Sequence, residues 1–265
     1  MSGGIITEIH RAALNDGPGV RTAVFFKGCP LRCLWCHNPE TQNPLPEPVN
    51  APVNPFAHAK MPPDSKTCLP ASGSFQGRLA EHDKRQVWGK YVTAEAVMDV
   101  VRLDAGHYAA TGGGVTLTGG EPLFQPGFAR ELLTLAKGEG FHTCVETSGF
   151  APVEALQPLL PLVDLWLFDI KGLPPKYPAL VGGCFSVVEQ ALQTLLKNEA
   201  AVLLRCPIVP SIHDNEAYYG YLEGLAASHP CIIGYELLPF HRLGMDKYEA
   251  LGRVAPMDFD NYDYN

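Results

Sequence analysis

The chain has 265 residues, 46% of them hydrophobic and 18% charged, with a formal net charge of −8. This length suits one large domain or two small ones, and the apolar content is enough for a substantial core. The negative charge argues against a nucleic-acid-binding surface as the main function. The chain has neither a run of roughly 18 apolar residues nor the basic and apolar blocks of a signal peptide at its start. We therefore expect a soluble, cytoplasmic monomer that binds neither nucleic acid nor membrane.

The first predicted element is an apolar strand over 20–26, and a cysteine cluster follows it directly. Cys29, Cys33 and Cys36 have the spacing C-x3-C-x2-C in GCPLRCLWCHN. One short loop can aim three thiolates at one point, yet an iron–sulfur cube or a structural zinc usually takes four ligands. The spacing therefore predicts a metal site with an open position. A Cys3His zinc site completed by His37 is the alternative, although adjacent Cys and His ligands are geometrically awkward.

After the cysteines the sequence becomes rich in proline. Eight prolines between Gln42 and Pro70 remove backbone donors and fix φ, which disfavours helices and central strands. We expect 42–90 to be an irregular Pro-rich insertion within a single domain that spans 1–265.

Beyond the insertion, apolar runs alternate with helical periodicity. The predicted strands are 114–117, 142–147, 165–171, 201–209 and 232–240, and the predicted helices are 94–101, 128–138, 152–160, 188–196 and 218–225. Near-continuous apolar strands that alternate with helices indicate an α/β fold with a parallel sheet covered on both faces. With 20–26 there are six strands, which suits a partial (β/α)6 TIM-like barrel; a doubly wound sheet is the alternative.

Each predicted strand ends in residues that can carry chemistry. In chain order these are the cysteine loop, TGGEP at 118–122, Glu146 with Thr147 and Ser148, Asp169 with Lys171, Arg205, and His241. Functional residues of parallel barrels gather at the carboxyl ends of the strands. We therefore expect these six features to share one rim.

Taken singly, these features also have ordinary structural explanations. GGEP can be a simple turn, Asp169 and Lys171 a simple ion pair, His241 a surface histidine, and Arg205 a counter-ion to the carboxylates. Cysteines within or beside apolar strands usually act as small hydrophobic residues, and this applies to Cys144, Cys206 and Cys231.

Five segments together resemble the glycyl-radical-enzyme activating enzymes of the radical S-adenosylmethionine (SAM) superfamily, whose best-known member is pyruvate formate-lyase activating enzyme. They are GPGVRTAVFFKGCPLRCLWCHNPET, GGGVTLTGGEPLFQ, VETSGF, DIK and LLPFHRLGMDKYEALG. The resemblance covers nearly all of 1–40 and most of 91–252. It implies an anaerobic oxidoreductase that cleaves SAM reductively at a [4Fe-4S] cluster. The 5′-deoxyadenosyl radical then abstracts a glycine Cα hydrogen in a partner glycyl radical enzyme. A flavodoxin or ferredoxin is the implied electron donor.

The resemblance also implies residue roles. Cys29, Cys33 and Cys36 would hold the cluster, and the SAM pocket would comprise Trp35, Cys36, His37, Gly119, Gly120, Glu121, Asp169, Ile170, Lys171 and His241. Lys171 would pair with the methionine carboxylate and His241 would contact the nucleoside. The two glycines would let the main chain approach the methionine amino group where a Cβ would collide.

Two further roles follow from the same resemblance. Asp169 and the acidic position of Glu146 can hold a monovalent cation near SAM, although that position is often aspartate. Asp16 in DGPG resembles a residue near the incoming glycine loop.

The chain departs from the family pattern in two places. Many members carry a ferredoxin-like insertion with two more clusters where this chain has 42–90, which contains only Cys68. Since each cluster needs about four cysteine ligands, we expect a single cluster that receives electrons directly. Members also usually continue beyond the segment matching LGRVAPMDF into a closing helix, so we expect a less complete seal here.

Two other functions stay open at this point. One is a radical SAM enzyme with a small-molecule substrate, and the other is a non-catalytic iron–sulfur or zinc-binding relative. The intact GGEP, DIK and His241 favour catalysis, because a protein without it has no physical need for all three.

Overall fold

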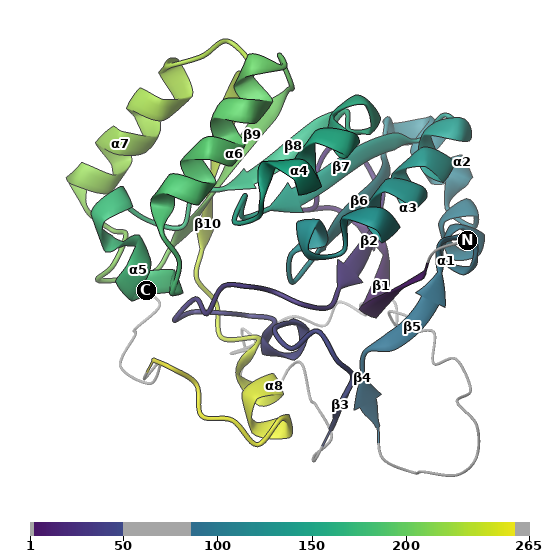
Figure 1. Cartoon of the computed structure of the whole chain (residues 1–265), viewed down its shortest axis with the longest axis horizontal. Helices are drawn as coiled ribbons and strands as arrows, with labels where there is room; N and C mark the ends of the chain where they lie inside the picture. Colours follow the sequence, from purple (N-terminus) through teal and green to yellow (C-terminus); the bar gives the residue numbers. More distant parts are fainter. Residues whose placement is uncertain (1–2, 50–85, 258–265) are drawn as a thin grey trace, which may run out of the picture.

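A computed structural model describes residues 3–49 and 86–257 (Figure 1). Its centre is an eight-stranded sheet in the order β10-β9-β8-β7-β6-β2-β1-β5. The parallel strands are β2 (Arg21–Phe26), β6 (Gly114–Gly119), β7 (His142–Thr147), β8 (Leu165–Asp169), β9 (Val202–Ile208) and β10 (Ile232–Pro239). Each adds beside its predecessor, whereas a doubly wound sheet reverses its strand order. The partial-barrel prediction is therefore confirmed.

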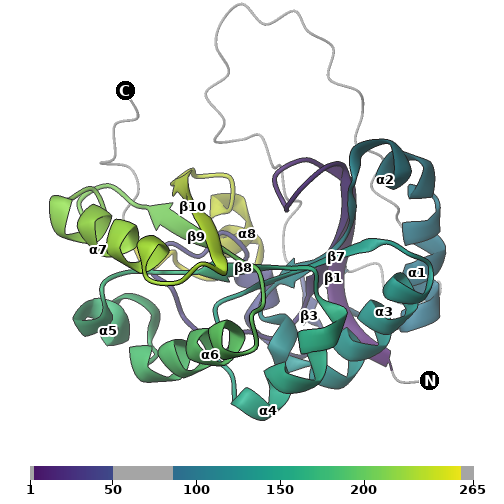
Figure 2. The ribbon, with the colours of Figure 1, turned by 90° about the horizontal axis from the view of Figure 1, so that it is seen from above.

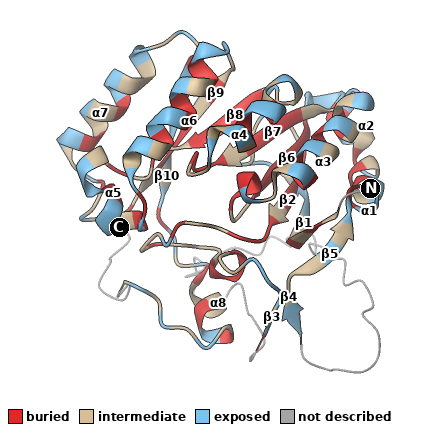
Figure 3. Cartoon of the chain, in the orientation of Figure 1, coloured by how far each residue is buried: buried red, intermediate tan, exposed pale blue. Residues whose placement is uncertain are grey.

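The predicted helices connect these strands. They are α1 (Ala94–Arg102), α3 (Pro126–Gly138), α4 (Val153–Leu156) with the 3-10 helix η3 (Gln157–Leu162), α6 (Phe185–Lys197) and α7 (Glu216–Ala227). The Thr93 hydroxyl accepts a hydrogen bond from the Ala96 amide at 3.2 Å and so fixes the start of α1. Figure 2 shows α3, α4 and α6 side by side along one face of the sheet, and Figure 3 shows that the helix sides turned away from it are exposed.

Several elements had not been predicted. In the main sheet these are β1 (Gly3–Ala13), which pairs antiparallel with β2, and β5 (Lys90–Thr93), which pairs antiparallel with β1; the short strands β3 and β4 are described below. The others are α2 (Ala105–Thr111), α5 (Tyr177–Val181), α8 (Met245–Ala250), η1 (Pro39–Thr41), η2 (Pro122–Phe124) and η4 (Pro174–Lys176). The chain thus enters the sheet by a hairpin, β1 and β2, rather than by a single strand.

The two ends of the insertion lie together. β3 (Glu47–Pro48) pairs with β4 (Val87–Trp88), and the Val49 amide donates to the Gln86 carbonyl at 2.7 Å. Residues 50–85, including Cys68, lie outside the described residues, so the expected irregular course stays a prediction there.

The inner strands carry the core. Fully buried side chains from four neighbouring strands pack against the helices, among them Val24, Leu117, Val145, Trp166 and Phe168. Cys144 and Cys206 are 0% exposed, as expected for small hydrophobic residues. Among the described residues, no single helix has the length and apolar character to cross a membrane. One pair meets that test only when its two helices, bent by 116°, are taken together.

Candidate functional site

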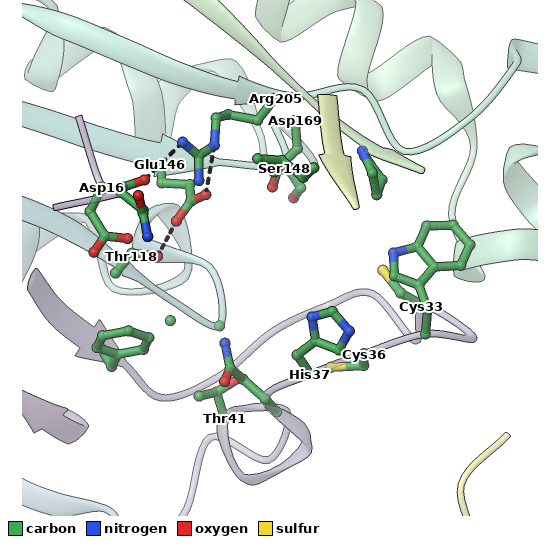
Figure 4. A pocket seen from close by; sticks show the side chains of 18 of the residues that line it. Asp16, Cys33, Cys36, His37, Thr41, Thr118, Glu146, Ser148, Asp169 and Arg205 are labelled. Carbon is green, nitrogen blue, oxygen red and sulfur yellow. Dashed lines mark hydrogen bonds and ion pairs between the residues drawn. The ribbon is translucent and has the colours of Figure 1, made fainter. Parts of the chain in front are cut away.

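A cavity of about 990 Å³ lies at the carboxyl ends of the parallel strands. Twelve of the predicted site residues line it: Asp16, Cys29, Cys33, Trp35, Cys36, His37, Gly119, Gly120, Glu146, Asp169, Lys171 and His241. Figure 4 shows Cys33 and Cys36 on one side of the cavity, with Glu146 and Arg205 across from them. Glu121 and Ile170 do not line it. The structure therefore brings together most of the residues that sequence reasoning selected.

The cysteine loop is held by main-chain hydrogen bonds at its start and between its first two cysteines. The Gly28 amide donates to the Thr41 carbonyl at 2.6 Å, and the Arg32 amide donates to the Val181 carbonyl at the end of α5 at 2.8 Å. Burial raises the pKa of Cys33 to about 12 and also raises that of Cys36. A metal that binds these cysteines must therefore displace protons from their thiols.

The zinc alternative required His37 as the fourth ligand. Its ring instead stacks on His241, with centroids 4.0 Å apart and an angle of 20° between the planes. Burial lowers the pKa of His37 to about 3, so the ring is neutral. In residues 3–49 and 86–257, no three His, Cys, Asp or Glu side chains converge as ligands of a single metal ion do. Thiolates that each bind a different iron need no such convergence, so this donor set fits a cluster.

The Gly-Gly turn packs directly on the cysteine loop. A Cβ on Gly120 would lie 2.5 Å from the Gly28 carbonyl oxygen, and one on Gly119 would lie 2.5 Å from the Phe26 amide nitrogen. Gly119 also has φ +104°, which favours glycine. Both glycines are therefore required by backbone packing within the protein, in addition to any approach by a ligand.

The Glu121 side chain lies inside the protein, away from the cavity. Its carboxylate accepts hydrogen bonds from the Thr147 hydroxyl at 2.7 Å, the Leu123 amide at 3.1 Å, and the amide and hydroxyl of Ser148 at 2.9 and 2.5 Å. Predicted as a cofactor contact, Glu121 instead joins the end of β6 to the end of β7.

The DIK segment follows β8. The Lys171 ammonium donates to the Asp169 carboxylate at 2.8 Å. Burial alone would lower the pKa of Lys171, but the Asp169 charge raises it well above its ordinary value. Ile170 is fully buried, and its carbonyl accepts a hydrogen bond from the Tyr218 hydroxyl at 2.6 Å. Ile170 thus holds the main chain, while its two neighbours face the cavity.

The opposite wall joins acids to one arginine. Arg205 Nε lies 3.5 Å from Glu146 Oε1, and Arg205 Nη1 lies 2.6 Å from Glu236 Oε2. The Thr118 hydroxyl also donates to Glu146 (Figure 4). Arg205 is the expected counter-ion. The Glu146 carboxylate, a predicted cation ligand, is already engaged by these two side chains.

Some cavity residues were missed. Glu8 and His10 reach the cavity from β1 and lie 2.9 Å apart, and the hydrogen bond that His10 donates to the Glu8 carboxylate raises the pKa of His10. They were missed because β1 was not predicted. His213, which follows β9 and was also not predicted, does not line the cavity; it is 1% exposed and meets the ring of the cavity residue Trp35 edge-on at 4.8 Å.

Residues after β10 cover the cysteine segment. The Tyr248 hydroxyl donates to the Cys36 carbonyl at 3.1 Å, and Lys247 donates to Glu40 at 2.5 Å. Arg253 donates to the Pro39 carbonyl at 2.8 Å. We call Lys247, Tyr248 and Arg253 the C-terminal latch. These contacts fasten the chain after β10 to the cysteine segment; the residues after Met257 lie outside the described residues, so the expected less complete seal stays a prediction.

Comparison with known proteins places this site in a family. The family model described as the radical SAM superfamily matches residues 23–218. The chain is 34% identical to the (2S)-3-sulfopropanediol dehydratase activating enzyme of Klebsiella oxytoca, over 94% of this chain and 86% of that relative. The chain belongs to the glycyl-radical-enzyme activating enzymes of the radical SAM superfamily.

A second relative supports the same membership. The benzylsuccinate synthase activating enzyme of Thauera aromatica is 32% identical, over 98% of this chain and 85% of its own length. Radical SAM enzymes use a [4Fe-4S] cluster and SAM. The relatives favour the activating-enzyme function over a radical SAM enzyme with a small-molecule substrate.

A solved structure supports the fold alone. QueE from Escherichia coli matches with a TM-score of 0.51 and 19% identity, over 95% of this chain and 92% of that one. At this identity the likeness shows the partial radical SAM barrel and no more.

Proposed function

We propose that Cys29, Cys33 and Cys36 bind one [4Fe-4S] cluster and that SAM occupies the adjoining cavity. The observation that carries this is the meeting of the three cysteines with the Gly-Gly turn, Lys171 and His241 around one space of about 990 Å³. That volume is at the upper end of what small-molecule sites provide, about 300–1,000 Å³. When bound, the two groups supply reductive cleavage of SAM and removal of a hydrogen atom from a glycine Cα.

The chain's own residues bind and orient SAM. Lys171, held by Asp169, faces the cavity as a cation and suits the methionine carboxylate. The stacked rings of His37 and His241 offer a flat apolar surface for the nucleoside. The main chain at Gly119 and Gly120 suits the methionine amino group. A monovalent cation beside Asp169 and Glu146 would have to share those carboxylates with Lys171 and Arg205.

The proposed partner is a glycyl radical enzyme whose glycine segment enters the cavity near Asp16. The two relatives are named for different partners, a dehydratase and a synthase, so similarity does not select one. We further propose a monomer that receives electrons from a flavodoxin or ferredoxin, as the resemblance implies. A cytoplasmic location suits three cysteines that must stay reduced.

Anaerobic reconstitution tests the cofactor assignment. The wild type should bind about four irons per chain and form 5′-deoxyadenosine from SAM with dithionite. Serine at Cys29, Cys33 or Cys36 should abolish both. Serine at Cys184, which is exposed and outside the cavity, is the matched control and should change neither. A fully loaded wild type that forms no 5′-deoxyadenosine would contradict the proposal.

A further inference from the structure

The loop between β1 and β2 is exposed, yet side chains from the sheet bind its main chain. We call residues 14–18 the entry loop. Leu14 is 70% exposed, and Asp16 and its neighbours line the cavity. Exposed loops usually leave their carbonyl groups to water. In the entry loop, three carbonyls are instead bound by protein side chains.

Each of the three donors comes from a different parallel strand. Arg205 of β9 donates to the Asn15 carbonyl at 2.9 Å, Thr116 of β6 donates to the Asp16 carbonyl at 2.6 Å, and Arg21 of β2 donates to the Pro18 carbonyl at 2.9 Å. Arg21 and Thr116 are 0% exposed and Arg205 is 7% exposed. The loop conformation is thereby tied to the rigid sheet.

Arg21 and Thr116 act as a unit. Arg21 Nε donates to the Thr116 hydroxyl at 2.6 Å, and Arg21 Nη2 donates to the Val115 carbonyl at 2.7 Å. The Thr116 hydroxyl therefore accepts a hydrogen bond from Arg21 and donates one to the Asp16 carbonyl. Gly17 completes the fit, because at φ +117° a Cβ would lie 3.1 Å from Cys144 Sγ and 3.2 Å from Arg21 Cδ.

Neither Arg21 nor Thr116 lines the cavity, so neither can touch the cluster or SAM. What they fix is the position of Asp16 at the cavity wall, beside Glu146 and Arg205 (Figure 4). A loop already held in one conformation has little freedom left to lose when a ligand binds to it. The geometry points to Thr116 and Arg21 as positioning residues that preform the entry loop as the platform for the partner's glycine-bearing segment. This inference rests on the proposed function.

The test compares Thr116→Val with Thr116→Ser in the iron-loaded enzyme. Valine keeps the shape but removes the hydroxyl, which leaves the Asp16 carbonyl and Arg21 Nε without this partner. Amide hydrogen exchange at Val20, which donates to the Thr111 hydroxyl at 2.9 Å at the base of the entry loop, should rise about tenfold for Thr116→Val as the loop loosens, the scale of one or two lost hydrogen bonds. Serine, which retains the donor, should restore wild-type exchange.

The functional readout separates effects on the partner protein from effects on SAM. Two partner proteins are tested, sulfopropanediol dehydratase and benzylsuccinate synthase, after which the two relatives are named. With Thr116→Val, the KM for the partner protein should rise about tenfold while kcat changes little. Formation of 5′-deoxyadenosine without partner should equal that of the wild type. Thr116→Ser should keep the wild-type KM.

The outcomes are distinguishable. If the wild type forms no 5′-deoxyadenosine, the proposed function fails. If it does, and the valine variant shows wild-type exchange or an unchanged partner KM, the positioning role is overturned. If the wild type cleaves SAM but activates neither partner protein, hydrogen exchange at Val20 alone tests the positioning role. Should Thr116→Val not fold, Asp16→Asn replaces it: this variant keeps the anchored carbonyl, so exchange should stay low while the partner KM rises.

Discussion

At the scale of single residues, the Glu121 carboxylate stabilises the fold and does not face the cavity. It is 0% exposed and accepts four hydrogen bonds from the ends of β6 and β7. Sequence reasoning selected it because it belongs to the GGEP motif, but a motif does not say which of its members face the ligand. Only the pairing of β6 with β7 brings Thr147 and Ser148 to this carboxylate.

We expect Glu121→Gln to lower the free energy of unfolding by about 2–3 kcal/mol, because an amide replaces two of the acceptor positions of a buried anion with donors. Urea denaturation of the cluster-free protein measures this. Glu154→Gln, at an exposed position of α4, is the control and should change stability by less than about 0.5 kcal/mol. Equal effects at the two positions would contradict the role given to Glu121.

Gly120 gives a second prediction at this scale. In Gly120→Ala the new methyl group would lie 2.5 Å from the Gly28 carbonyl oxygen, so the turn must move away from the cysteine loop. We expect a loss of about 1–3 kcal/mol in stability and a lower iron content after reconstitution. Gly127→Ala is the matched control, because no atom lies within 4 Å of its Cβ position. Iron content should be unchanged there.

At the scale of elements, the Asp104 carboxylate fixes β1 through an ion pair with Arg11. Arg11 on β1 donates to the Asp104 carboxylate at 3.0 Å, and Thr22 on β2 donates to it at 2.8 Å. Burial would raise the pKa of Asp104, but these hydrogen bonds lower it below its ordinary value of 3.8. The carboxylate thus joins the hairpin to the turn before α2.

The pH dependence of stability tests this joint. Because the folded-state pKa of Asp104 is lowered, its stabilisation is complete above the ordinary value and is lost as pH falls through the folded-state value. The difference in unfolding free energy between wild type and Asp104→Asn should be about 1–2 kcal/mol near neutral pH and shrink as pH falls below the ordinary aspartate pKa of 3.8. Urea titrations across this range measure it. A difference that grows as pH falls would contradict the stabilising role of the ionised Asp104 carboxylate.

The elements also show what sequence can predict. Five of the parallel strands, β2, β6, β7, β8 and β9, are mostly buried on both faces, which leaves long apolar runs such as the Trp166–Phe168 region. β10 was predicted from its apolar residues, although most of its side chains are exposed or half-buried. β1 was not, because only Ile6 and Gly4 are buried along its eleven residues. α2, α5 and α8 have 7, 5 and 6 residues, too short for a helical period to stand out.

For the site, position at a strand end was a sufficient signal for Glu146, Asp169 and Lys171. It could not reveal Lys247, which reaches the cavity from a helix beyond the last strand, or His10, which comes from a half-exposed strand. These residues join the site through tertiary contacts between distant parts of the chain. Local sequence carries no trace of such contacts.

At the scale of the whole molecule, the C-terminal latch covers the cysteine segment. We expect Tyr248→Phe, which loses the hydrogen bond to the Cys36 carbonyl, to speed loss of the cluster in air about two- to tenfold. Visible absorbance of the reconstituted protein follows this loss. Tyr91→Phe, at a residue 68% exposed on β5, should behave as the wild type. Equal rates for the two variants would remove the latch from any role in protecting the cluster.

The latch also sets an order of events during synthesis. Tyr248 and Cys36 are 212 residues apart, so a ribosome exposes the cysteines on the order of 10–40 s before it makes the residue that covers them. During that interval the thiols face the cell and its iron–sulfur carriers without a cover. Cluster insertion into the nascent chain can therefore precede the latch, whereas the finished protein must be reloaded through the cavity that the three cysteines line.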